Sequence, residues 1–186
     1  VDIFSGLDLV ETVRPYRQDE LGSRVRVVWE GAEYRGRFRQ VIWDGSAFLS
    51  DNEIISATPI NFFNKDKTLE KTASNELHWK ALTTGNIGGF DIILADAYNG
   101  TLKIETPLIK AGVPIEDIGF EDEVFDNSGV LPRYLKIFRL PTENPHKTMR
   151  FSRLIDLKAV GDNPIFIRLT QEDGTLVWTS PIYVYR

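Results

Sequence analysis

The sequence contains no cysteine and only two histidines among its 186 residues. The absence of cysteine excludes disulfides, thiol nucleophiles, iron–sulfur clusters and cysteine-type zinc sites, but it leaves the cellular compartment open. The histidines, His78 and His146, are 68 residues apart and form no His-x-His or His-x-x-x-His pair. Such spacings are what place two imidazoles on one metal ion. We therefore expect no catalytic residue, metal ion or cofactor in this chain by itself.

Long apolar runs are also missing. No run approaches the ~20 residues of a membrane-spanning helix, and no signal-peptide pattern is present. The formal net charge is −5 and the pI about 5.1, so overall attraction to nucleic acid or to an anionic membrane is not expected, although a local basic patch stays open. No helical pattern longer than about two turns persists, and no fixed-period repeat occurs.

Short strand-like runs separated by turn residues make up most of the chain from Arg24 onward. This spacing predicts an all-β fold, an antiparallel β-sandwich of about ten or eleven strands that forms a single domain over residues 21–186. Residues 1–20 mix apolar and charged side chains around Pro15 and predict a short N-terminal arm that acts as a linker or a docking edge. A short helix from about Leu7 to Val13 is an alternative within this arm.

Three residue pairs predict tight turns between strands: Asp51-Asn52, Asn99-Gly100 and Asp173-Gly174. Asn, Asp and Gly tolerate left-handed backbone angles, and we expect a β-hairpin at each pair. Asn64 to Lys71 is polar and predicts an exposed loop. The strands are expected at Arg24–Trp29, Gly36–Trp43, Ala47–Leu49, Glu53–Ser56, Glu76–Leu82, Phe90–Leu94, Thr101–Thr106, Arg133–Leu140, Met149–Leu154, Pro164–Thr170 and Leu176–Tyr185.

Two segments contain residue types that can bind ions, but their spacing favours structural interpretations. The acidic stretch consists of Glu116, Asp117, Glu121, Asp122, Glu123 and Asp126. Calcium loops space their acids in an Asp-x-Asp-x-Asp-Gly pattern, which is missing here, so a solvated loop between strands is favoured. Gly85 to Gly89 is glycine-rich but lacks the Lys-Ser/Thr of a phosphate-binding loop and precedes no helix, so a tight turn before the Phe90 strand is favoured.

The most distinctive cluster is basic and contains Arg14, Arg17, Arg24, Arg26, Arg35, Arg37 and Arg39. Strand alternation places Arg24 with Arg26, and Arg37 with Arg39, on common sheet faces. If those strands are neighbours, Arg24, Arg26, Arg35, Arg37 and Arg39 form a candidate contact for an anion or an acidic partner. Acidic residues in the same stretch make ordinary surface ion pairs the favoured alternative.

Aromatic residues could instead line a carbohydrate or peptide groove. They include Trp29, Phe38, Trp43, Phe48, Phe62, Phe63 and Trp79. Most of them occupy alternating strand positions, so core packing is expected for most of the set.

Several segments together resemble a known domain. They are Leu21 to Gly31, Tyr34 to Arg39, Val41 to Gly45, Leu82 to Gly85 with Gly88-Gly89-Phe90, Ile167 to Gly174, and Val177 to Val184. Over residues 21–186 the sequence resembles the largely uncharacterised C-terminal β-domain of bacterial proteins that are similar to the PHP (polymerase and histidinol phosphatase) metal-dependent phosphoesterases. These motifs are structural, and the metal-binding His and Asp residues of PHP-like proteins belong to the catalytic barrel, so no catalytic residue is carried over.

The resemblance implies a non-catalytic accessory domain of a larger PHP-like hydrolase. Its partners would be the catalytic domain of the same parent chain and a second copy in a homo-oligomer, with no nucleic acid and no membrane among them. Residues 1–20 would be the connection from the barrel. Two alternatives stay open: a ligand-binding module with carbohydrate as its ligand, and, with less support, an independent hydrolase that uses carboxylates without a recognisable spacing.

Overall fold

The computed structural model describes residues 1–33 and 39–185, and every sheet in that part of the chain is antiparallel. The fold is all-β, as the sequence predicts, and these described residues form seventeen strands and two three-residue 3₁₀ helices, η1 (Gln18–Glu20) and η2 (Ile115–Asp117). No helix among the described residues is long and apolar enough to cross a membrane. The strands exceed the ten or eleven expected because several of the segments that pair are only two to four residues long.

The chain divides into two compact units. One unit consists of Arg17–Asn144, and the other combines Val1–Tyr16 with Pro145–Arg186. We call them the sandwich unit and the terminal unit. This division differs from the expected arm over residues 1–20 and single domain over residues 21–186. The reason is long-range pairing, because the first strand of the chain lies against a strand that starts 160 residues later, at Asp162.

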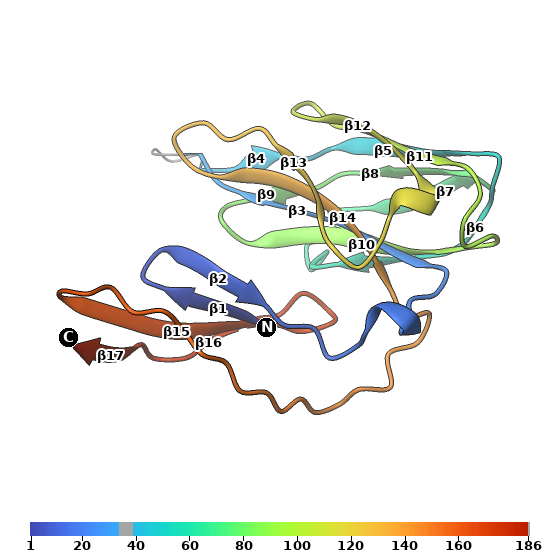
Figure 1. The fold of residues 1–186 in the computed structure, drawn as a ribbon. Coiled ribbons are helices and arrows are strands. Elements are labelled where there is room, and N and C mark those ends of the chain that lie inside the picture. Colours follow the sequence, from blue (N-terminus) through green and yellow to red (C-terminus); the bar gives the residue numbers. More distant parts are fainter. Residues whose placement is uncertain (34–38, 186) are drawn as a thin grey trace. The chain divides into compact units, whose positions relative to one another are not determined.

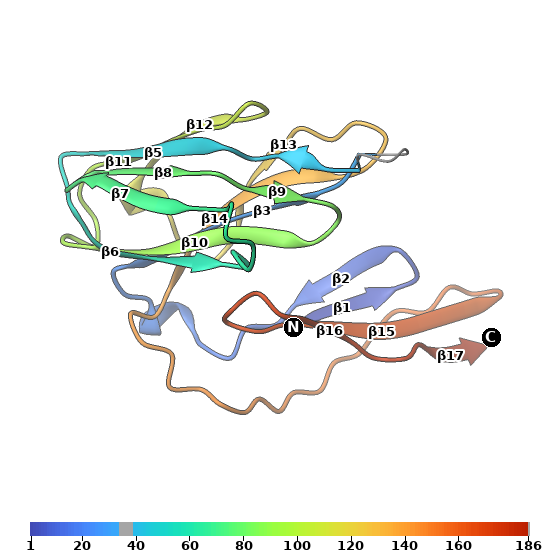
Figure 2. The same ribbon diagram turned by 180° about the vertical axis from the view of Figure 1, so that it is seen from behind.

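The sandwich unit contains two five-stranded sheets, which form separate layers in Figures 1 and 2. One sheet has the order β13 (Glu123–Asp126), β14 (Arg133–Leu140), β3 (Arg24–Gly31), β10 (Ile87–Leu94) and β6 (Ile54–Ile60). The other has the order β12 (Lys110–Pro114), β11 (Thr101–Glu105), β5 (Gly45–Ser50), β8 (Glu76–Trp79) and β7 (Leu69–Ala73). A short pair, β4 (Val41–Ile42) and β9 (Leu82–Thr83), lies beside them.

Alternating apolar residues of both sheets form one core. Along β3, Val25, Val27 and Trp29 are buried with the inward residues of β14 and β10, such as Leu135 and Phe90. The facing sheet contributes Leu49, Leu77, Trp79, Leu102 and Ile104. Burial of these apolar side chains is the main stabilisation of the unit.

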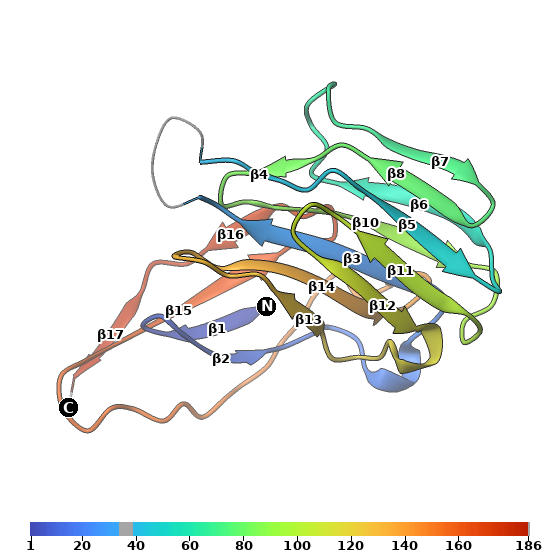
Figure 3. The same cartoon turned by 90° about the horizontal axis from the view of Figure 1, so that it is seen from above.

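The terminal unit has one sheet, in the order β16 (Leu176–Trp178), β15 (Asp162–Thr170), β1 (Asp2–Ser5) and β2 (Asp8–Thr12). A fifth strand, β17 (Ile182–Tyr185), also pairs with β15, and Figure 3 shows β16 and β17 following each other along it. Asp8–Thr12 is therefore a strand, so the alternative of a helix from Leu7 to Val13 is wrong. Its pairing with β1 satisfies the backbone groups that an isolated helix of that length would leave exposed.

Of the three predicted hairpins, the one at Asp173-Gly174 is confirmed, because it joins the paired strands β15 and β16. The other two predictions are wrong. Asp51-Asn52 connects β5 to β6 and Asn99-Gly100 connects β10 to β11, and in both cases the flanking strands belong to different sheets. Asp51 and Gly100 do adopt the expected positive φ, at 55° and 94°. The local conformation was thus correctly predicted, but each turn crosses between the layers.

The strand at Arg133–Leu140 is confirmed with the same bounds, and those at Ala47–Leu49, Phe90–Leu94 and Pro164–Thr170 are confirmed with slightly different bounds. Met149–Leu154 forms no strand, and the segment that was expected to be a loop, Asn64 to Lys71, runs into β7. The expected strand Gly36–Trp43 lies partly outside the described residues, and only Val41–Ile42 of its described part is a strand.

Candidate interaction face

The strands β15, β16 and β17 present three exposed aromatic side chains on one face of the terminal unit's sheet. Trp178 lies opposite Arg168, Tyr183 opposite Pro164 and Tyr185 opposite Asp162. Residues directly opposite each other in an antiparallel pair share a face, and so do residues two apart along a strand. The exposed fractions are 57% for Trp178, 54% for Tyr183 and 71% for Tyr185. We call these three residues the C-terminal aromatic face.

The local sequence explains why the three rings follow one line. Pro181 has no backbone N–H to donate, so it interrupts the ladder between β16 and β17. The Thr179 hydroxyl accepts a hydrogen bond from Ile167 N at 3.0 Å and keeps the interrupted chain beside β15. At about 3.3 Å per residue along β15, Tyr185 and Tyr183 are about 7 Å apart, and Trp178 lies about 13 Å beyond Tyr183.

The same face is held rigid by contacts from β1. The rings of Phe4 and Phe166 stack with centroids 4.9 Å apart and an interplanar angle of 5°. The Arg168 guanidinium donates to Asp2 Oδ2 at 2.9 Å and lies 5.4 Å from the centroid of the Phe4 ring. These contacts hold β15, the strand that pairs with Trp178, in place. The exposed rings therefore project from a defined backbone.

Exposed rings on a rigid sheet are suited to binding. Trp, Tyr and Arg contribute most of the binding free energy in protein interfaces, because each buries a large area while losing few rotatable bonds. The ring of each exposed residue also carries a polar group, the indole N–H or the phenol O–H, that can hydrogen-bond to a ligand. The arrangement therefore provides a surface for a partner or a ligand.

The predicted arginine stripe is only partly assembled by the described residues. Arg24 and Arg26 share a face, as expected, and both donate to Asp91 on the neighbouring strand β10. Arg26 Nε is 2.7 Å from Asp91 Oδ1, and Arg24 Nη2 is 2.5 Å from Oδ2. The side chains of this ion cluster are nearly buried and lie on the face of β3 opposite the core residues Val25, Val27 and Trp29. The sequence alone did not point to Asp91.

Arg39 is exposed and lies away from that ion cluster. Its carbonyl accepts from Glu33 N at 3.0 Å, beyond the end of β3 at Gly31. Arg26 and Gly31 are separated by about 17 Å of strand. Arg35 and Arg37 lie outside the described residues. Arg17, also in the basic stretch, pairs with Asp19 at 2.9 Å on the surface.

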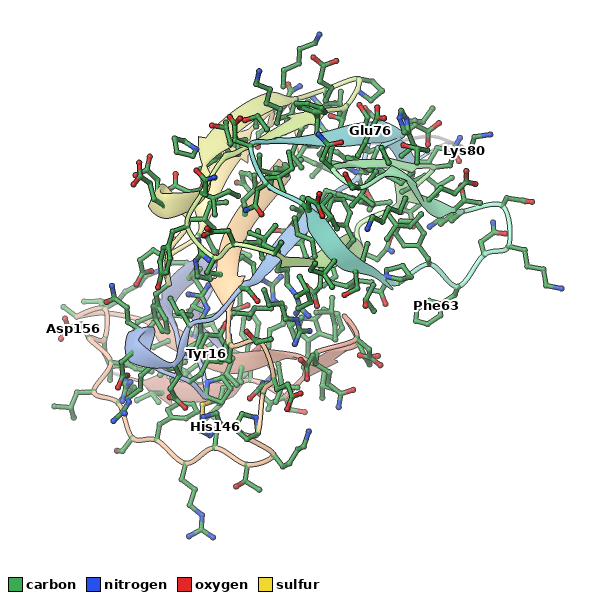
Figure 4. The ribbon with its side chains drawn as sticks, turned by 90° about the vertical axis from the view of Figure 1, so that its right-hand side faces the viewer. Tyr16, Phe63, Glu76, Lys80, His146 and Asp156 are labelled. Carbon is green, nitrogen blue, oxygen red and sulfur yellow. The ribbon has the colours of Figure 1, made fainter. Side chains whose placement is uncertain are left out.

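Most of the aromatic residues considered for a groove in the sandwich are in its core. Trp29, Trp43 and Trp79 are buried, and the ring centroid of Trp29 is 5.5 Å from that of Trp79 and 6.3 Å from that of Trp43. Phe62 packs against this cluster. Phe48 is partly exposed, Phe63 projects outward after β6 (Figure 4), and Phe38 lies outside the described residues. Core packing is thus confirmed for the three tryptophans.

The histidines lie in different environments. His78 Nε2 is 3.0 Å from Glu76 Oε1 on the exposed side of β8, and His146 belongs to the irregular segment of the terminal unit that follows Pro145 (Figure 4). Within residues 1–33 and 39–185, no three His, Cys, Asp or Glu side chains are grouped so as to hold a metal ion.

The acidic stretch divides between secondary structure and loop. Glu116 and Asp117 belong to η2, and Glu123 and Asp126 belong to β13. The expected solvated loop is therefore wrong for residues 123–126, where pairing with β14 forms a strand. The glycine-rich segment contains the expected turn at Gly85, whose φ is 105°. Gly88 and Gly89 are already in β10, where a Cβ would approach Trp29 Nε1 and the Val27 carbonyl to 2.8 and 2.2 Å.

Sequence reasoning did not single out a second buried cation, Arg139 on β14. Its guanidinium donates to the carbonyls of Ile118, Gly22, Ala97 and Ile115. Burial lowers the pKa of Arg139, because the charged form loses contact with water. The available signal was a basic residue that continues the inward-pointing apolar series Leu135 and Ile137 of β14.

Comparison of the chain with models of protein families, with curated proteins and with solved structures found no significant match.

Proposed function

We propose that the chain is a non-catalytic accessory module of a larger PHP-like metal-dependent hydrolase, and that it packs on the catalytic domain of that protein through the C-terminal aromatic face. The observation that supports this proposal most is the joint exposure of Trp178, Tyr183 and Tyr185 on one face of a single sheet. Two of the segments that carry the resemblance, Ile167 to Gly174 and Val177 to Val184, form the strands that present these rings.

The side-chain chemistry of the face favours a protein surface as the partner. A docked domain would cover the exposed rings of Trp178 and Tyr185, and the Arg168–Asp2 pair would lie beside Trp178 on the same face. Interfaces of this composition concentrate their binding free energy in a few aromatic side chains. The module would shape access to the metal site of the catalytic domain or support the assembly of the parent protein.

The test is binding in trans. The catalytic domain of a PHP-like parent is titrated with this chain by calorimetry, and a measurable affinity is expected. Trp178→Ala and Tyr185→Ala should each weaken binding by about 2 kcal/mol, roughly thirtyfold in Kd. Phe63→Ala removes a more exposed ring, in the sandwich unit, and should leave the affinity unchanged. Equal affinity for wild type, Trp178→Ala and Tyr185→Ala would contradict the proposal.

A second experiment addresses the role in the parent protein. Deleting the module from the full-length parent should change its phosphoesterase activity, its stability or its state of assembly. If all three properties are the same with and without the module, an accessory role is contradicted.

Carbohydrate binding is the second candidate function, and the same face is the observation that favours it. A planar aromatic ring can contact the C–H face of a sugar, and Asp162 and Thr170, which share that face of β15, offer oxygen atoms to its hydroxyl groups. Trp29, Trp43 and Trp79 cannot contribute, because they are buried. Retardation of the chain in polysaccharide gels that Trp178→Ala abolishes would support this candidate, and unchanged migration in all gels would contradict it.

A further inference from the structure

The free edge of β17 has the properties of a strand that pairs with another strand. Within the described chain β17 pairs with β15 alone, so its other side presents backbone N–H and C=O groups without a neighbouring strand. The sequence Ile-Tyr-Val-Tyr is composed entirely of residues with high β-propensity. Ile182 is 70% exposed on one face, and Tyr183 and Tyr185 are exposed on the other.

The other edge strands of the described sheets carry features that discourage pairing, namely charged residues, proline, irregular register or very short length. β2 has Asp8, Glu11 and a shift in its register with β1. β16 is only three residues long. In the sandwich unit, the corresponding residues are Glu123 and Asp126 in β13, Pro59 in β6, Lys110 and Pro114 in β12, and Glu70 and Lys71 in β7. The four residues of β17, which follow Pro181, include no charge and no proline, and their pairing with β15 has no irregular register.

We infer that β17 is a homodimerisation strand, which pairs antiparallel with β17 of a second copy of this chain. The argument for a second copy is the self-complementary sequence Tyr183-Val184-Tyr185. A two-fold axis through Val184 and perpendicular to the sheet places Val184 opposite its own copy, and Tyr183 opposite Tyr185 of the copy, twice. Opposed aromatic residues are favourable cross-strand pairs, and no like charges meet.

This geometry closes on itself. Each copy contributes its five-stranded sheet, and the two β17 edges are both used in one isologous contact, so the assembly stops at two. Because the axis is perpendicular to the sheet, the C-terminal aromatic faces of both copies lie on the same side and become continuous. The inference concerns the edge of the sheet and goes beyond the proposed docking of its face.

Sedimentation velocity of the full 186-residue chain over a range of concentrations tests the inference. Wild type should be a reversible dimer. The variant Tyr183→Lys/Tyr185→Lys opposes lysine to lysine twice and should be monomeric, and so should Tyr183→Glu/Tyr185→Glu. An equimolar mixture of these two variants should form a heterodimer. The variant Tyr183→Lys/Tyr185→Glu opposes lysine to glutamate twice in the proposed register and should remain dimeric.

Two controls keep these results specific. Circular dichroism should show that each variant is folded, since both tyrosines are more than half exposed. Leu9→Lys adds a lysine to the edge strand β2 and should leave the dimer intact. A monomeric wild type, a dimer that survives the double lysine substitution, or assembly beyond two copies would overturn the inference. The variant Tyr183→Lys/Tyr185→Glu also separates the two proposals, because it should dimerise while losing affinity for the catalytic domain.

Discussion

At the scale of single residues, the sandwich unit depends on two buried cation sites on β3 and β14. Arg24 and Arg26 both pair with the single carboxylate of Asp91, whereas Arg139 donates to four carbonyls and lies 5.4 Å from the centroid of the Tyr98 ring. The carbonyls belong to the segment before β3, the loop after β10 and the region around η2. Arg139 therefore joins three segments that are distant in the sequence.

Replacing Arg139 by lysine should lower the free energy of unfolding by about 2–4 kcal/mol. A single ammonium group cannot reach four carbonyls arranged around a planar guanidinium, and buried acceptors without a donor cost about 1–3 kcal/mol each. Urea denaturation of Arg139→Lys measures the change, with exposed Arg150→Lys as the control. Equal stability of the two variants would show that the carbonyl contacts contribute little.

At the scale of elements, the two turns that cross between the sandwich layers are tied to each other by asparagine side chains. Asn52 Nδ2 donates to the carbonyls of Asp96 and Asn99 at 2.7 and 2.8 Å, and Asn99 Nδ2 donates to the carbonyl of Asp51 at 2.7 Å. These bonds keep the connections β5–β6 and β10–β11 side by side at one end of the two sheets.

Gly100→Ala should destabilise the sandwich by about 2–4 kcal/mol. Gly100 has a φ of 94°, and a Cβ would lie 2.1 Å from the carbonyl oxygen of Ser50. Strain of this kind and a steric clash with backbone add to each other. Gly119→Ala is the matched control, since a Cβ there would meet no atom within 4 Å. Thermal unfolding should give a lower melting temperature for Gly100→Ala than for Gly119→Ala. Similar melting temperatures would contradict the turn geometry.

The β15–β16 hairpin should respond to acid through Asp173. The backbone N–H of Thr175 donates to Asp173 Oδ1 at 2.9 Å, and this bond holds the pKa of the carboxyl below its ordinary value. A carboxyl with a lowered folded pKa stabilises the hairpin above its unfolded pKa, near 4, and this stabilisation is lost as the pH falls through the folded pKa. NMR titration should show the Thr175 amide and the Asp173 carboxyl shifting together below pH 4. An amide shift that persists in Asp173→Asn would rule out this coupling.

The sequence patterns predicted local structure better than they predicted which strands pair with each other. The alternation of Val25, Val27 and Trp29 against Arg24 and Arg26 correctly predicted the two faces of β3, because side-chain direction in a strand is a local property. The partners of a strand are not local. Nothing near Asn99-Gly100 indicates that β11 pairs with β5, or that β1 pairs with β15. Two predicted hairpins were therefore wrong, and the two units divide the chain at other residues than the predicted domain boundary.

The candidate site shows the same limit. The sequence predicts that the residues of the C-terminal aromatic face lie in strands. It does not predict their exposure, because exposure depends on how β16 and β17 pair with β15 and on what covers that sheet. The ion cluster was predicted only in part. The sequence predicted that Arg24 and Arg26 share a face, but not that they pair with Asp91, which lies 65 residues beyond Arg26.

At the scale of the whole molecule, the sandwich unit is inserted in the sequence of the terminal unit. The terminal unit takes its strands from both ends of the chain. The sandwich unit has its own core, whereas β15 depends on β1 as a neighbour. The two units should therefore differ in their dependence on the rest of the chain.

Residues 17–144 should fold when expressed alone, with a dispersed NMR spectrum and the blue-shifted fluorescence of buried Trp29, Trp43 and Trp79. Residues 145–186 should not fold alone, since β15–β17 would lack the Phe4–Phe166 stack and the Asp2–Arg168 pair that β1 provides. Adding a peptide of residues 1–16 should restore structure to them. A folded 145–186 peptide without that addition would contradict the proposed dependence on β1.

Acrylamide quenching of tryptophan fluorescence tests whether the C-terminal aromatic face is the docking surface. Three of the four tryptophans are buried and Trp178 is 57% exposed, so the isolated chain should contain one accessible component, which Trp178→Phe removes. When the catalytic domain of a PHP-like parent is added, the account predicts that this component becomes protected while the other three stay unchanged. Unaltered quenching of Trp178 in the presence of a bound catalytic domain would show that the C-terminal aromatic face is not the docking surface.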